Sequence, residues 1–154
     1  MIEILDETEG LDDASAGLLK AAAEAFLTEA DPGGGMKGVA RLTLILLDDE
    51  RIRLLNQRDR GLDEATDVLS YPAVEPDDEG FPQVAHLGDI FISTETASRQ
   101  AAAAGVPLLS ELLTLFAHGF THLLGYDHDT EAEWLVFERA QARILELAGL
   151  QGSP

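Results

Sequence analysis

The hydrophobic positions of the first fifty residues follow two different patterns. Between Asp12 and Ala30, apolar residues recur at the three- and four-residue intervals of one helix face, at Leu19, Ala22, Ala23, Phe26 and Leu27. The segment 39–49, VARLTLILLDD, is instead continuously apolar and partly β-branched, which predicts a strand with at least one buried face. A shorter strand is predicted over 2–5, and 31–38, DPGGGMKG, should break any helix.

The next segments are shorter and more polar. We expect a helix over 50–58, capped by Asp48 or Asp49, and a loop from Arg60 to Thr66, where periodicity is lost. The stretches 67–72, DVLSYP, and 87–93, LGDIFIS, predict two strands joined in a hairpin-like pair by the turn-rich loop 75–83.

The C-terminal half is predicted to be helical. Ser93 can cap a helix that ends at Gly105, and Pro107 suits the first turn of a second helix, which Gly125 ends. A final helix from about Thr130 carries one apolar face, formed by Trp134, Phe137, Ala140, Ile144 and Leu147.

These elements predict an α+β (mixed α/β) fold. We expect one domain over residues 1–154, with a small mixed β-sheet of about four strands packed with about five helices. The sequence shows no internal repeat and no interdomain linker.

Composition limits the chemistry. The chain has no cysteine, so disulfides and thiolate metal sites are excluded, and any metal must be held by nitrogen and oxygen. The acidic N-terminus lacks the pattern of a signal peptide, and no stretch approaches eighteen uninterrupted apolar residues. We therefore expect a soluble, cytoplasmic protein with no membrane partner.

The formal net charge of −19 argues against general, sequence-independent nucleic-acid binding, which needs clustered Lys and Arg. Four of the ten basic residues nevertheless fall within ten positions, at Arg51, Arg53, Arg58 and Arg60. They indicate either exposed arginines on a surface helix or a local anion-binding patch.

The segment 118–128, HGFTHLLGYDH, contains three of the four histidines. On a helix, His118 and His122 project from the same face and can bind one ion, and Gly125 permits a turn that returns His128 as a third ligand. Three protein ligands plus water are typical of a catalytic zinc. A pair of histidines four apart can also be two satisfied polar residues at a helix edge.

This spacing also matches the metzincin protease motif HExxHxxGxxH, in which the glutamate polarises the zinc-bound water. Here Gly119 stands in its place. A zinc peptidase or related hydrolase would therefore need a base from elsewhere, and it is retained as an alternative.

The histidine segment resembles the signature HGxLHLxGYDH of the YbeY family of metal-dependent endoribonucleases, with Thr121 in place of a leucine. Other residues resemble the family pattern NxxYRGxDxxTDVLSFP in the same order, namely Asn56, Arg60, Gly61, Asp63 and 66–72, TDVLSYP, followed by 88–93, GDIFIS, and Glu111. The resemblance covers roughly residues 40 to 145. Asp59, Leu62 and Ala65 depart from the tyrosine, lysine and proline common in the family.

The resemblance implies one Zn²⁺ ion held by His118, His122 and His128, with Arg60 acting in the active site. It also implies cleavage of single-stranded RNA, maturation of the 3′ end of small-subunit (16S) ribosomal RNA, and ribosome quality control. The expected partners are ribosomal RNA and the small ribosomal subunit, together with a protein that recruits the RNA. A non-catalytic ribosome assembly factor with a structural zinc is a further alternative.

The remaining candidates are residues near this predicted site. Guanidinium groups bind phosphate bidentately, so Arg60 and Arg58 are predicted to contact RNA, with Ser70 and Asp67 lining the cleft. Asp127 either orients a histidine from outside the ligand shell or forms a turn, and Asp129 has the same alternatives. His86 is expected at a strand edge. The nucleophile, zinc hydroxide or the RNA 2′-hydroxyl, stays open.

Overall fold

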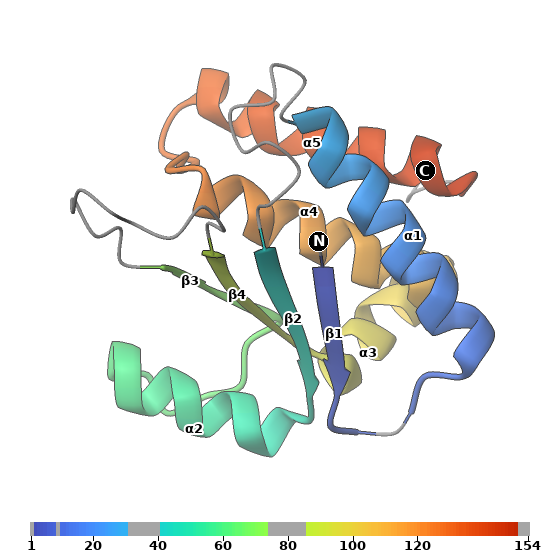
Figure 1. The fold of residues 1–154 in the computed structure, drawn as a ribbon. Coiled ribbons are helices and arrows are strands. Elements are labelled where there is room, and N and C mark those ends of the chain that lie inside the picture. The colour runs from blue at the N-terminus through green and yellow to red at the C-terminus, as the bar shows by residue number, and fades with distance from the viewer. Residues whose placement is uncertain (1, 9, 31–40, 74–85, 151–154) are drawn as a thin grey trace, which may run out of the picture.

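The computed structural model describes residues 2–8, 10–30, 41–73 and 86–150 (Figure 1). Its sheet has the order β1-β2-β4-β3. The first three of these strands are parallel, and β3 pairs antiparallel with β4 at the edge. The strands are β1 (Ile2–Asp6), β2 (Arg41–Leu47), β3 (Val68–Pro72) and β4 (His86–Ser93).

Five helices accompany the sheet within the described residues. They are α1 (Asp13–Ala30), α2 (Asp49–Arg60), α3 (Thr94–Ala104), α4 (Leu108–Leu123) and α5 (Glu131–Ala148). Figure 1 shows α2 on one side of the sheet and the other four helices on the opposite side. The predicted fold, a mixed four-stranded sheet with five helices, is confirmed.

The alternation along β2 explains the two layers. Successive side chains of a strand point to opposite faces. Leu42, Leu44 and Leu46 join the main core with α1, α4 and α5. Ile45 and Leu47 join a smaller core with Ile52 of α2 and Leu69 of β3. Because both faces of β2 are covered, the strand is almost continuously apolar.

Helix α4 is the central helix of the main core. Its Phe116 and Phe120 are fully buried, and the ring of Phe120 meets that of Phe26 edge-on with centroids 5.5 Å apart. Only one stripe along the middle of α4 is partly exposed, formed by Glu111, Thr114, His118 and His122. The packing therefore leaves one open line on a buried helix, and two of the histidines lie on it.

Most predicted boundaries agree with the structure. Asp48, Ser93 and Thr130 cap the N-termini of α2, α3 and α5 through their side chains. Two predictions shift: Arg60, assigned to a loop, is the last residue of α2, and Pro107 is the N-cap of α4 and precedes its first turn. The predicted loop 75–83 and the break at 31–38 lie outside the described residues.

One face of α5 was predicted to be apolar. Phe137 and Ile144 are fully buried, and Ala140 and Leu147 are partly buried against the main core. Trp134 differs, because 44% of its surface is exposed. Across the described segments, no single helix has the length and apolar character needed to span a membrane, and the one pair that has them together, α3 with α4, is bent by 115°.

Candidate metal centre

The three histidines predicted as ligands meet at the C-terminal end of α4. Ring nitrogens of His118, His122 and His128 lie within 4.8 Å of one another. The ring centroids are 4.9 Å apart for His118 and His122, and His128 lies 5.6 Å and 5.3 Å from them. Zinc–nitrogen bonds of about 2.0–2.1 Å hold the ligand nitrogens within about 4.2 Å of one another, so at most a small inward movement of the rings lets one ion contact all three imidazoles.

The turn that returns His128 to the helix depends on Gly125. Its φ is +94°, a conformation that side chains with a Cβ rarely adopt. Its N–H donates to the carbonyl of His122 at 2.9 Å, which closes the helix end. The predicted role of Gly125 as the helix-ending turn is confirmed.

Neighbouring groups orient two of the imidazoles. His122 Nδ1 lies 3.1 Å from the Tyr126 carbonyl oxygen, so Nδ1–H donates there and the Nε2 lone pair is left for a metal. His118 Nδ1 lies 3.2 Å from the amide nitrogen of Gln141. If that amide were rotated, its oxygen would accept from Nδ1–H, and Nε2 of His118 would then be left for a metal as in His122.

Burial disfavours the charged form of these two imidazoles. It lowers the pKa of His118, and the neighbouring His122 lowers it further. Burial also lowers the pKa of His122, although the hydrogen bond to the Tyr126 carbonyl acts in the opposite direction. A metal binds the neutral imidazole, so the lowered pKa of His118 and of His122 favours the binding of an ion.

A buried phenylalanine supports the whole cluster from α5. The ring centroid of Phe137 lies 4.8 Å from that of His118, 4.7 Å from that of His122 and 5.3 Å from that of His128. The sequence placed Phe137 on an apolar stripe but gave no sign of this contact, nor of the contact made by Gln141. This shared apolar contact limits movement of the three imidazole rings and makes the protonated, charged form of an imidazole less favourable.

The histidines open into a cavity of about 430 Å³ between α4, the edge strand β3 and the end of α2. Its lining consists of Arg60, Asp67, Val68, Ser70, His118, His122, Asp127 and His128. Two grooves of about 520 and 550 Å³ lie elsewhere, but neither contains a histidine. The smaller cavity therefore holds the candidate chemistry.

Arg60 is the only arginine or lysine that lines this cavity among the described residues. Gly61 ends α2 immediately after it, with its N–H bonded to the Gln57 carbonyl at 3.1 Å. The buried Asn56 donates from Nδ2 to the Glu64 carbonyl at 3.0 Å, which fixes the loop that follows. The helix end and the loop thus hold Arg60 opposite the histidines.

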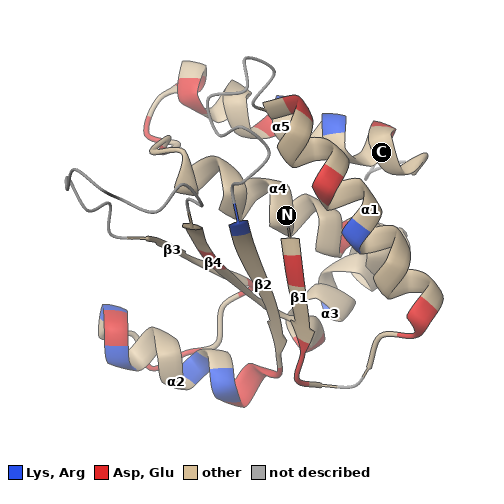
Figure 2. Ribbon diagram, viewed as in Figure 1, with Lys and Arg blue, Asp and Glu red and all other residues tan. Residues whose placement is uncertain are grey.

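The predicted anion-binding patch of four arginines is not a free cationic surface. Arg51 pairs with Glu7 at 3.1 Å, and Arg53 pairs with Glu50 at 3.0 Å. Figure 2 shows the acidic and basic residues interspersed along α2. Because Arg51 and Arg53 are already paired with acids, the structure favours the alternative of exposed arginines on a surface helix for these two residues.

Arg58 is also occupied. It forms a bidentate pair with Asp59, with N···O distances of 2.8 and 2.9 Å, and it does not line the cavity. The structure therefore separates Arg58 from Arg60 although they are close in sequence. The predicted contact of Arg58 with RNA has no support from this geometry.

Ser70 and Asp67 line the cavity as predicted. Ser70 Oγ donates to the Gly119 carbonyl at 3.0 Å. Asp67 accepts from the N–H of Val68 at 2.8 Å and from the Gln100 amide at 3.3 Å. Burial raises the pKa of the nearby Glu111 carboxyl, and the charge of Asp67 raises it further.

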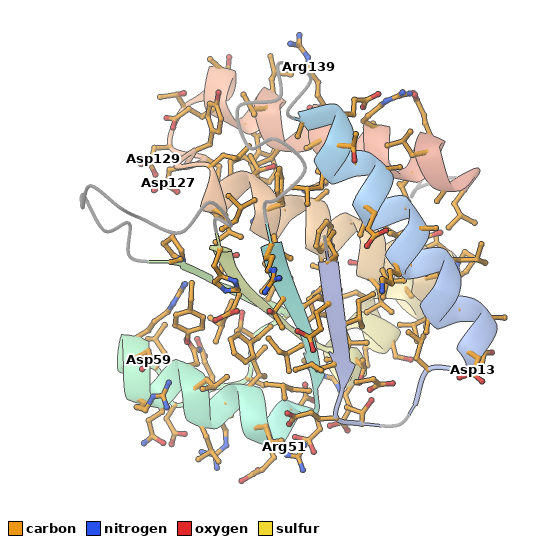
Figure 3. All side chains as sticks on the ribbon, viewed as in Figure 1. Asp13, Arg51, Asp59, Asp127, Asp129 and Arg139 are labelled. Atoms are coloured by element: carbon orange, nitrogen blue, oxygen red, sulfur yellow. The ribbon has the colours of Figure 1, made fainter. Side chains whose placement is uncertain are left out.

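Three other candidates have local roles. Asp127 Oδ1 accepts from the backbone N–H of His128 at 3.0 Å, which is the turn-forming alternative and not a contact with an imidazole nitrogen. Figure 3 shows Asp127 and Asp129 on the loop between α4 and α5, and Asp129 does not line the cavity. His86 is bound to Asp89 at 3.0 Å at the start of β4, away from the cluster.

Comparison with known proteins places this site in a family. The family model described as Endoribonuclease YbeY matches residues 3–149, which is nearly the whole chain. The chain belongs to the YbeY family. An Endoribonuclease YbeY from Thermus thermophilus is 54% identical over 115 residues, covering 75% of this chain and 79% of that protein. One from Rhodopseudomonas palustris is 41% identical over 150 residues, covering 93% and 78%.

A solved structure supports the same fold. The solution structure of TM1509 from Thermotoga maritima is similar with a TM-score of 0.61 and 27% sequence identity. The match covers 95% of this chain and 90% of that one. The fold of this YbeY family member therefore has a relative among solved structures over nearly its full length.

The packing of α4 explains the glycine at position 119. A Cβ there would lie 2.9 Å from Ser70 Oγ, 3.0 Å from Ile90 Cγ2 and 3.3 Å from Val68 Cγ2. The helix thus lies directly against β3 and β4, and a glutamate at this position would collide with the sheet. The glutamate that serves as base in a metzincin protease is absent from this YbeY chain, and the close packing around position 119 explains why a side chain of that size does not fit there.

Substitution Gly119→Ala is expected to lower the free energy of unfolding by about 1 kcal/mol. Overpacking costs about 1–3 kcal/mol, and the gain in helix propensity over glycine returns up to about 1 kcal/mol. Gly17→Ala is the matched control, because Gly17 lies within α1 with no atom within 4 Å of an added Cβ. We expect it to raise stability by about 0.5–1 kcal/mol. Denaturant unfolding of metal-free protein measures both, and equal stabilisation would contradict the close packing.

Two departures from the YbeY family pattern are coupled in space. Asp59 stands where the family has tyrosine, and Tyr71 stands where the quoted pattern has phenylalanine. The Tyr71 hydroxyl donates to Asp59 Oδ2 at 2.7 Å and joins the end of α2 to β3. Figure 3 shows Asp59 at that end of α2. The pair therefore braces the turn that carries Arg60.

This contact gives a pH prediction. Burial raises the pKa of Tyr71 to about 12, and the hydrogen bond to Asp59 and its charge contribute to the same shift. Because the folded pKa lies above the unfolded value of about 10, the contribution to stability is complete below pH of about 10 and is lost as pH rises through about 12. Asp59→Asn should bring the pKa part of the way back.

Ultraviolet titration of tyrosinate measures this pKa, with Tyr71→Phe identifying the signal of Tyr71 against that of Tyr126. An unchanged Tyr71 pKa in Asp59→Asn would show that the carboxylate does not hold the hydroxyl.

Proposed function

We propose that this chain is a zinc-dependent endoribonuclease that cleaves single-stranded RNA. The observation that carries the proposal is the placement of Arg60 in the same cavity as the three histidines. Phosphodiester hydrolysis needs an activated nucleophile and a cation for the charge that develops on the phosphoryl oxygens. The name of the family, Endoribonuclease YbeY, supports the same activity.

His118, His122 and His128 would hold the metal. Three imidazoles with no thiolate suit zinc, although other divalent transition metals also bind imidazole. When bound, a zinc ion supplies Lewis acidity to a phosphoryl oxygen and to a water molecule. His118 would be catalytic in this sense, since it would hold the metal, and its ring is itself positioned by Gln141.

Arg60 binds the substrate phosphate. Its guanidinium can donate two parallel hydrogen bonds to phosphoryl oxygens, and these strengthen as negative charge builds up in the transition state. Asp59 is paired with Arg58 and Tyr71, so it does not neutralise Arg60 through an ion pair of its own.

Ser70 contributes an acceptor. Its hydrogen is used in the bond to the Gly119 carbonyl, so only oxygen lone pairs face the cavity. Such an acceptor suits a donor such as the ribose 2′-hydroxyl better than a phosphate oxygen. This contact would favour RNA over DNA at the cleaved nucleotide.

The proposed substrate in the cell is the 3′ end of small-subunit ribosomal RNA, in maturation and ribosome quality control. Ten basic against 29 acidic residues give poor long-range attraction for RNA. The small ribosomal subunit, or a protein bound to it, would therefore present the RNA strand to the cavity.

A cleavage assay on three substrates tests the activity. Purified zinc-loaded protein is given a labelled single-stranded RNA, the same strand in a duplex, and an unfolded polypeptide. We expect cleavage of the single strand, little cleavage of the duplex and none of the polypeptide. Polypeptide hydrolysis that is lost in His118→Ala, with the RNA left intact, would instead establish the peptidase alternative.

A further inference from the structure

An exposed tryptophan lies beside the metal centre. Trp134 is the only tryptophan of the chain and lies in the first turns of α5, and 44% of its surface is exposed. Its ring centroid is 5.4 Å from that of His128, with the two rings nearly perpendicular at 88°. The other neighbour is Phe137, at 6.2 Å and 27°.

The exposure of this ring needs a reason. Tryptophan is among the side chains that lose most free energy when apolar surface stays in water, and it is highly buried on average. Phe137, one helical turn further along α5, is fully buried against the three histidines. The aromatic surface thus continues from the core, under the metal ligands, and out to solvent at Trp134.

We propose that Trp134 is a stacking platform for an unpaired nucleobase next to the cleaved phosphate. This inference rests on the proposed function and adds a substrate contact to it. A base on this ring would lie beside His128, and therefore beside the cavity that receives the phosphate. Base–aromatic stacking is largely independent of sequence and needs a base that is not already paired.

The charge distribution favours such a contact. Proteins that bind single-stranded nucleic acid usually combine a cationic groove with aromatic platforms. Here Arg60 is the only cation lining the cavity within the described ranges, and Arg58 is paired with Asp59. Ionic contacts are few, so the platform supplies a larger share of the binding.

Two substitutions separate stacking from packing. In Trp134→Leu the aromatic face is lost, and we expect KM for single-stranded RNA to rise roughly 5- to 100-fold, with kcat within about twofold of wild type. Trp134→Phe keeps a ring and should recover most of the KM. Leu135→Ala is the matched control, because Leu135 is the next residue and is 45% exposed, and its KM should not change.

The fluorescence of the single tryptophan gives a direct reading of the contact. Zinc-loaded Arg60→Ala protein cuts RNA slowly by the proposed mechanism, so it can be titrated to equilibrium. Single-stranded RNA should quench Trp134 saturably, and the same strand in a duplex should quench it much less.

The outcomes distinguish this inference from the function on which it rests. Unquenched fluorescence at saturating RNA, or a wild-type KM in Trp134→Leu, would overturn the platform while cleavage by wild type stands. A fall in kcat and zinc content without a rise in KM would also overturn it, because Trp134 would then only support His128. If RNA quenched the fluorescence of Trp134 but wild-type protein did not cut that RNA, the proposed nuclease activity would be refuted while the stacking contact would stand.

Discussion

Substitution His118→Ala is expected to remove both the bound metal and RNA cleavage. Loss of partners outside the ligand shell already costs about 10- to 100-fold in metal affinity, and His118 is a predicted direct ligand. We therefore expect zinc content to fall close to zero and the cleavage rate to fall on the order of a thousandfold or more. Elemental analysis and initial rates on single-stranded RNA measure the two effects.

His86→Ala is the control for this substitution. His86 is the one histidine outside the cluster and is bound to Asp89 on the surface. Zinc content and cleavage should both stay near wild type. If His118→Ala lost zinc and also failed to fold, while Arg60→Ala left the processing of ribosomal RNA in cells unchanged, the metal would be structural and the alternative of a non-catalytic assembly factor would stand.

Substitution Arg60→Ala is expected to slow cleavage by about 10²- to 10³-fold without loss of zinc. Removing one preorganised donor to a developing anion costs about 2.7–4 kcal/mol of transition-state stabilisation in hydrolases. The guanidinium of Arg60 lines the cavity but is not a metal ligand, so metal content should not change. Single-turnover rates at saturating RNA measure the chemical step.

Two further arginine variants complete the comparison. Arg60→Lys keeps the charge but loses the bidentate geometry, so it should recover only part of the rate. Arg58→Ala should change the rate by less than about threefold, because Arg58 is paired with Asp59 outside the cavity. Equal losses in the Arg58 and Arg60 variants would mean that both serve a general anion-binding patch, as one interpretation of the sequence held.

Much of the fold could be predicted from periodicity. The five apolar positions of the first helix are the residues that α1 buries, namely Leu19, Ala22, Ala23, Phe26 and Leu27. The cap at Ser93 could be predicted, and that of α2 could be narrowed to Asp48 or Asp49, because a side-chain cap is a local feature. The strand order could not be predicted, because alternation shows which face a strand buries but not which strand lies beside it.

The metal ligands could be predicted because, like a helix cap, they form a local pattern in the sequence. The spacing of His118 and His122 and the turn at Gly125 are local, whereas Arg60 is distant in sequence, and its place beside the histidines was indicated only by the family resemblance. Contacts between distant segments account for what was missed. Phe137 and Gln141 support the cluster from another helix, and Glu7, which follows β1, pairs with Arg51 of α2.

Gly119 is a further case in which contacts with distant segments could not be predicted from the sequence. The sequence revealed that glutamate is absent from the protease-like motif, but the reason lies in Ser70 and Ile90 on neighbouring strands. Trp134 was assigned to an apolar face because its spacing fits that face. Its exposure follows from where α5 begins relative to the loop of His128, which periodicity does not show.

Dependence of RNA cleavage on added zinc is the most direct test of the metal centre. Protein stripped by a chelator is given increasing zinc, and the initial rate on single-stranded RNA is measured at each addition. We expect a background rate without zinc, a rise to a plateau at about one equivalent per chain, and no rise in His118→Ala. A full rate in the stripped protein would contradict a nuclease that works through the three histidines.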